Sequence, residues 1–144
     1  DLPEELRAVE WIAYASNAFN AMVPFYANVE QTPAYLADTT GEVSTESFYW
    51  VSRMIAAMAD ASYGKSVFHV ERYELGALSA CRALLNEYDA KQLAQPDAAA
   101  RAALREQGNA AIAAEIKARA ADTLDKVLFE LSSGMKNAYS RSDM

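Results

Sequence analysis

The sequence predicts an α+β fold in which an N-terminal β-hairpin is followed by three mostly long α-helices. Three observations support this class. Two runs rich in β-branched and aromatic residues precede residue 27, apolar residues recur at helical spacing after residue 44, and proline or glycine separates these segments. We therefore expect a hairpin and loop over residues 1–43 and a helical part over residues 44–144. Together they would form a single domain or the C-terminal fragment of a larger one.

The hairpin is expected to pair a strand over residues 9–14 with a strand over residues 19–26, through a turn at 16–18. Pro24 lacks an N–H group and so indicates a sheet edge or a strand end. An isolated hairpin is marginally stable in water, and its alternating side chains present apolar groups on both faces. We therefore expect it to be covered by an upstream part of the same protein or by self-association.

The first predicted helix begins with Ser44 or Thr45 as its cap and ends at Gly64. Ser66 is the expected cap of the second helix. Its predicted core stripe recurs at three- and four-residue steps and comprises Val70, Tyr73, Ala77, Cys81, Leu84 and Tyr88, with Leu78 and Leu85 widening it.

A break at Pro96 separates the second helix from the third, for which Asp97 is the expected cap. The third helix would run to about residue 137, with a kink or a split at Gly108 and Asn109. Unbroken, it would be roughly 60 Å long at about 1.5 Å per residue.

The charge pattern excludes several partners. The formal net charge is −7, and Lys and Arg are not concentrated in any stretch, so we expect no nucleic-acid partner. No apolar run approaches the roughly 20 residues of a membrane helix, so we expect no membrane partner. The single cysteine, Cys81, favours a reducing, cytoplasmic location, although many exported proteins also lack disulfides.

No complete catalytic constellation is visible. His69 and Cys81 are the only residues of their kinds, and twelve residues on one helix separate them by about 18 Å in rise and about 120° in azimuth. A nucleophile and its base need hydrogen-bond contact. One His and one Cys also fall short of the usual structural zinc sets. We therefore predict no catalytic residue, no metal and no cofactor in this chain.

Four segments nevertheless resemble one family, in this order: EWIAYA at residues 10–15, VPFYANV at 23–29, TPAY at 32–35 and SFYWVSR at 47–53. Over roughly residues 2–90 the chain resembles the late part of the bacterial N-terminal-nucleophile cysteine dipeptidases. The resemblance implies a four-layer αββα fold and hydrolysis of short peptides. The nucleophile would be a cysteine exposed at the mature N-terminus, with its own α-amino group as the base.

Asp1 departs from that pattern, so no catalytic residue is carried over. The chain would then be the C-terminal scaffold part of a cysteine dipeptidase, with the catalytic cysteine on a part outside these residues. Polar groups at the hairpin turn, Ser16, Asn17 and Asn20, are the predicted wall of a substrate pocket. The alternative interpretation is a non-enzymatic helical interaction or oligomerisation module.

The 144-residue chain alone is expected to have no dipeptidase activity, because Asp1 is not a nucleophile and His69 cannot reach Cys81. The purified chain and its Cys81→Ala variant can be compared on a panel of dipeptides. Turnover that the substitution abolishes would contradict this prediction.

Overall fold

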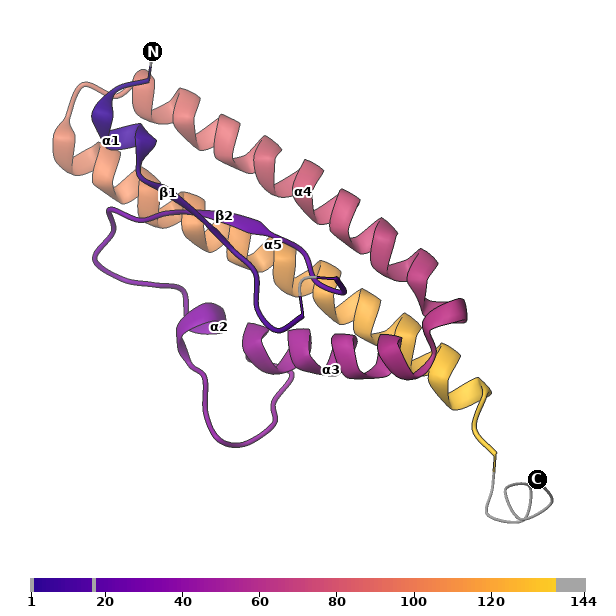
Figure 1. Cartoon of the computed structure of the whole chain (residues 1–144). Coiled ribbons are helices and arrows are strands. Elements are labelled where there is room, and N and C mark those ends of the chain that lie inside the picture. The colour runs from indigo at the N-terminus through magenta and orange to yellow at the C-terminus, as the bar shows by residue number, and fades with distance from the viewer. Residues whose placement is uncertain (1, 17, 137–144) are drawn as a thin grey trace.

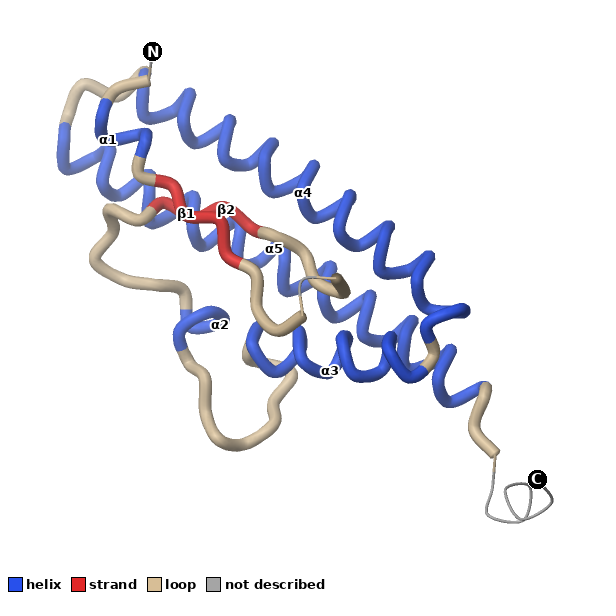
Figure 2. The backbone as a smooth tube through the Cα atoms, viewed as in Figure 1, coloured by secondary structure: helices blue, strands red, loops and turns tan. Residues whose placement is uncertain are grey.

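The computed structural model describes residues 2–16 and 18–136 of the chain (Figures 1 and 2). Its elements are, in order, α1 (Glu4–Arg7), β1 (Val9–Ile12), β2 (Val23–Tyr26), α2 (Ala34–Ala37), α3 (Phe48–Ala61), α4 (Tyr63–Leu93) and α5 (Ala98–Ser133). The long helices α4 and α5 pack side by side, and the hairpin and α3 pack against this pair. The predicted α+β class is confirmed, and two single-turn helices, α1 and α2, add to the three long ones.

The two strands are shorter than the sequence predicts. β1 and β2 pair antiparallel, with Val9 opposite Tyr26 and Ile12 opposite Val23. The chain leaves β1 before Tyr14, whose hydroxyl donates to the carbonyl of Leu36 at 3.2 Å. The expected strands over 9–14 and 19–26 are thus wrong at their facing ends, because Tyr14 bonds to α2 and Asn20 bonds to α3 instead of continuing the ladder.

One side chain of α5 closes the outer edge of β2. Asn109 Oδ1 accepts the backbone N–H of Tyr26 at 2.8 Å, and Asn109 Nδ2 donates to the Tyr26 carbonyl at 3.0 Å. The buried amide thus occupies the place of a neighbouring strand. Residues two apart present their backbone groups to the same edge, so Pro24 is the next residue there, and it has no N–H to satisfy.

Gly108 allows α5 to approach the hairpin this closely. A Cβ atom at this position would lie 3.0 Å from Tyr26 Cε2 and 3.0 Å from Tyr88 Cγ, tighter than ordinary contact. Of the two expected alternatives at Gly108 and Asn109, the split is wrong, since α5 is continuous from Ala98 to Ser133. The glycine therefore serves close packing of helix against strand.

The junction of α3 and α4 also differs from the prediction. α3 ends at Ala61, one turn before the expected stop, and Gly64 lies inside the first turn of α4. Ser62 makes the break, with its hydroxyl donating to the Met58 carbonyl at 2.7 Å. Ser66 does not cap α4 but is buried within it, 2.6 Å from the Ser62 hydroxyl.

The N-terminus of α5 has the predicted side-chain cap, whereas the N-terminus of α3 does not. Asp97 caps α5 as predicted, because its Oδ2 accepts the N–H of Ala100 at 2.8 Å. Ser44 does not cap α3. Its hydroxyl accepts the N–H of Glu46 at 3.0 Å in the preceding turn, and Ser47 takes the N-cap position without a side-chain bond.

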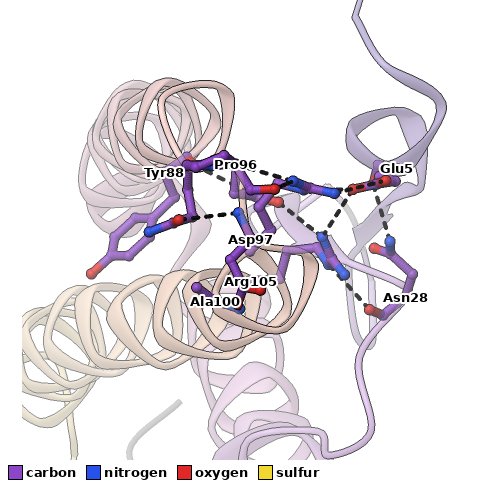
Figure 3. A network of polar contacts seen from close by, with 10 residues as sticks. Glu5, Asn28, Tyr88, Pro96, Asp97, Ala100 and Arg105 are labelled. Atoms are coloured by element: carbon purple, nitrogen blue, oxygen red, sulfur yellow. Dashed lines mark hydrogen bonds and ion pairs between the residues drawn. The ribbon is translucent and has the colours of Figure 1, made fainter.

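A polar network fastens the N-terminal residues to the start of α5 (Figure 3). Arg101 Nε donates to Glu5 Oε2 at 3.0 Å, which holds the pKa of that carboxyl below its usual value. The nearly buried Arg105 donates to Gln92 Oε1 at 3.2 Å and to the Asn28 carbonyl at 3.3 Å. The network joins α1, the loop after β2 and the end of α4.

Among the described helices none has the length and apolarity for a membrane span.

The amide contact of Asn109 generates a stability prediction. Asn109→Ala is expected to lower the free energy of unfolding by about 2–4 kcal/mol, since a buried N–H and a buried C=O of Tyr26 both lose their partner. Gln107→Ala, at an exposed position on the same helix, is the matched control and is expected to change stability by less than about 0.5 kcal/mol. Urea unfolding followed by tryptophan fluorescence measures both, and equal midpoints would refute the proposed role of the amide.

Candidate functional site

An open groove of about 550 Å³ lies between the loop after β1 and α3. Side chains on one face of α3 form one wall, because they recur at helical spacing. The loop forms the other. The lining residues are Ala15, Ser16, Phe19, Tyr49, Arg53, Ala56, Ala57 and Asp60.

The helical wall of the groove carries a fixed cation. Arg53 Nη1 donates to the Tyr49 hydroxyl at 2.8 Å, and the guanidinium carbon lies 5.6 Å from the Tyr49 ring centre and 5.8 Å from the Trp50 ring centre. Trp50 is itself anchored, since its Nε1 donates to the Thr40 carbonyl at 2.8 Å. Within the described part of the chain no carboxylate lies within ion-pair distance of Arg53. The guanidinium therefore has donors left for an anionic ligand.

The loop wall contains a strained residue. Ala15 has φ of 58°, in the left-handed region that residues with a Cβ atom rarely adopt, at a cost of roughly 1–2 kcal/mol. Three hydrogen bonds hold the segment in this shape. Tyr14 is tied to Leu36, and Asn20 Nδ2 donates to the carbonyls of Ser16 at 3.0 Å and Ser52 at 3.1 Å. The strain fixes the direction of the chain where it borders the groove.

The structure separates the residues predicted for the pocket. Ser16 is exposed and lines the groove. Asn20 is 3 % exposed and lies beneath the loop, where it joins the loop to α3. Asn17 falls outside the described residues. Sequence reasoning missed Tyr49, Arg53 and Asp60, which also line the groove. Their spacings of four and seven residues place them on one face of the predicted helix, and this was the signal that could have identified them.

The chain's histidine and cysteine do not meet. Both lie on α4, which is continuous from Tyr63 to Leu93. His69 Nε2 lies 3.2 Å from Glu130 Oε1 on α5, whereas Cys81 is fully buried in the core. Burial, with a smaller contribution from Glu115, raises the pKa of the Cys81 thiol to about 11, so it stays protonated at neutral pH. Neither residue is placed for nucleophilic catalysis.

The described residues do not form a cluster of metal ligands. Over residues 2–16 and 18–136, no three His, Cys, Asp or Glu side chains are grouped so that they could hold a metal ion. What the groove offers instead is a guanidinium, a phenol and a carboxylate on one helical wall, facing a short loop. Such a set is suited to bind and orient a polar ligand, and among the described residues of the groove no serine hydroxyl is paired with a histidine base.

Comparison with known proteins places these features in a family. Residues 1–76, which include the hairpin and the start of α4, match the model of peptidase family C69. A probable dipeptidase A of Streptococcus pyogenes serotype M18 (strain MGAS8232) is 36 % identical over 141 residues, which is 98 % of this chain and 29 % of that protein. A dipeptidase of Bifidobacterium longum (strain NCC 2705) is 51 % identical over 72 residues, which is 50 % of this chain and 14 % of that protein.

A third relative matches more than half of the chain. Dipeptidase A of Lactobacillus helveticus is 32 % identical over 89 residues, which is 62 % of this chain and 19 % of that protein. The chain thus spans less than a third of the length of the curated relatives it matches. The family model covers more than half of the chain, and the first relative covers nearly all of it. The chain belongs to peptidase family C69.

Proposed function

We propose that this chain is the C-terminal scaffold of a cysteine dipeptidase that hydrolyses short peptides. The catalytic N-terminal cysteine would lie on a part of the protein outside residues 1–144. The observation that carries the proposal is the state of Cys81, the chain's one cysteine, which is buried and protonated and therefore unfit as a nucleophile. Relatives named as dipeptidases support the substrate class.

The free edge of β1 supports a place within a larger sheet. Backbone groups of an antiparallel strand alternate between its two edges. The backbone groups of Tyr26 point away from β1 and towards Asn109. Val9 is paired with Tyr26, so the backbone N–H and C=O of Val9 point away from β2, and those of Trp11, two residues on, point the same way. In the described part of the chain these two N–H and two C=O groups have no hydrogen-bond partner. We propose that a strand of the remaining protein pairs here, which would fit the αββα arrangement that the family resemblance implies.

The groove supports a role in substrate binding. A short peptide carries a terminal carboxylate, for which the unpaired guanidinium of Arg53 is a fitting partner. The groove is bordered on its other side by Ser16, at the turn where Ser16, Asn17 and Asn20 are the predicted pocket residues. We propose that this end of the hairpin and the exposed face of α3 form one wall of the peptide site.

The first test concerns the nucleophile. In the intact protein, Cys81→Ala is expected to retain dipeptidase activity, while a thiol-alkylating reagent abolishes activity in both the variant and the wild type. Cys81 in the folded protein is expected to be alkylated at least about a hundredfold more slowly than Cys81 in the protein unfolded in urea, because the folded state keeps the thiol buried and protonated. Loss of activity in Cys81→Ala with an unchanged thermal midpoint would overturn the proposed location of the nucleophile.

The second test concerns the groove. Ala57→Trp is expected to fill the groove and to lower kcat/KM for dipeptides by about tenfold or more, mainly through KM, because it removes substrate contacts without touching the nucleophile. Ala103→Trp, at an exposed position of α5 away from the groove, is the matched control. If both variants keep the wild-type kcat/KM, the groove does not face the substrate.

A further inference from the structure

The two sides of α4 differ in what covers them. Its inward side carries the buried residues Val70, Tyr73, Ala77 and Cys81 and packs on α5, with β2 and α3 at its flanks. Its outward side has no other described element against it, and α4 forms one border of the molecule in Figure 1. Three large apolar side chains are nevertheless exposed there, with Leu75 70 %, Phe68 51 % and Leu78 36 % exposed.

These side chains are part of a regular pattern. Phe68, Glu71, Leu75, Leu78 and Arg82 follow each other at alternating three- and four-residue steps, which is the seam of a paired helix. We call these five residues the α4 stripe. Neither Glu71 nor Arg82 forms an ion pair within the described part of the chain. The Arg72 guanidinium lies 4.0 Å from the centre of the Phe68 ring, but half of Phe68 and most of Leu75 remain exposed. The stripe thus combines opposite charges that form no ion pair with exposed apolar groups.

The stripe is complementary to itself in one direction. When two copies of α4 pack antiparallel about a two-fold axis that passes between Gly76 and Ala77, residues whose numbers sum to 153 face each other. Leu75 then faces Leu78 of the second copy, and Glu71 faces Arg82 of the second copy. Phe68 faces the partly buried Leu85 of the second copy. Parallel packing would instead set Glu71 against Glu71 and Arg82 against Arg82.

We propose that the α4 stripe is a homodimer interface, in which two copies of this protein pack α4 against α4 antiparallel about a two-fold axis. A closed two-fold contact uses the same patch on both subunits, and the stripe meets that condition in both shape and charge. Each dimer contains two Glu71–Arg82 pairs, one on either side of the central leucines. The surface lies on the side of α4 opposite the core, so it is independent of the groove and of the β1 edge.

Charge exchange is the direct test, made on the intact protein by sedimentation velocity over a concentration series. Glu71→Arg and Arg82→Glu are each expected to weaken dimerisation by about tenfold or more, because each change places like charges together twice in every dimer. The double variant Glu71→Arg/Arg82→Glu is expected to restore the wild-type dissociation constant. Glu87→Arg, an equal charge change at an exposed position of α4 off the stripe, is expected to leave it unchanged.

Disulfide trapping fixes the direction. A mixture of the Leu75→Cys and Leu78→Cys variants is expected to form intermolecular disulfides several-fold faster than either variant alone. The wild-type protein measures the background from its native thiols, to which buried Cys81 is expected to add nothing. Faster linkage of either variant with itself would overturn the antiparallel arrangement. A wild-type protein that remains monomeric at tens of micromolar, or a dimer that the single charge reversals leave intact, would overturn the interface itself.

Discussion

The fold depends on one contact, the pairing of the Asn109 amide with both backbone groups of Tyr26. It links residues 83 positions apart and attaches a two-stranded sheet, which is too small to be stable alone, to the long helix α5. Gly108 makes the contact possible, because any side chain there would meet the rings of Tyr26 and Tyr88. Closing the β2 edge in this way leaves β1 as the open edge of the sheet. The hairpin, in turn, positions the loop that borders the groove.

The helices were largely readable from the sequence because their signals are local. Asp97 caps α5 and Pro96 precedes it, as the residue types indicate. Val70, Tyr73, Ala77 and Cys81 of the expected α4 stripe are buried, whereas Leu84 and Tyr88 are only partly buried and Leu78 is 36 % exposed. The errors arose where a tertiary contact outweighed a local preference. Ser66 has the chemistry of a cap but is buried next to Ser62, and Gly64 lies in the first turn of α4 instead of ending α3. Tyr14 and Asn20 leave the strands because α2 and α3 offer them partners.

The candidate site was less predictable for the same physical reason. Ser16 was identified because turns favour exposed polar residues, and it does line the groove. Arg53 was not, since one arginine on a helix surface resembles any solvated charge until the loop that faces it is placed. The role of Asn109 was equally hidden, because an Asn within a helix gives no sign of a partner 83 residues away. What the sequence did indicate was the absence of a reactive pair, because the separation of His69 from Cys81 along one helix follows from helix geometry.

Native-state hydrogen exchange at the Tyr26 amide tests the central claim most directly. The account predicts that this amide, although it lies at a sheet edge, exchanges as slowly as the amide of Ile112 in the buried part of α5, because both open only when the helices and the hairpin separate. If the Tyr26 amide exchanges orders of magnitude faster than that of Ile112, the hairpin opens independently of α5, and the Asn109 contact does not hold the fold together.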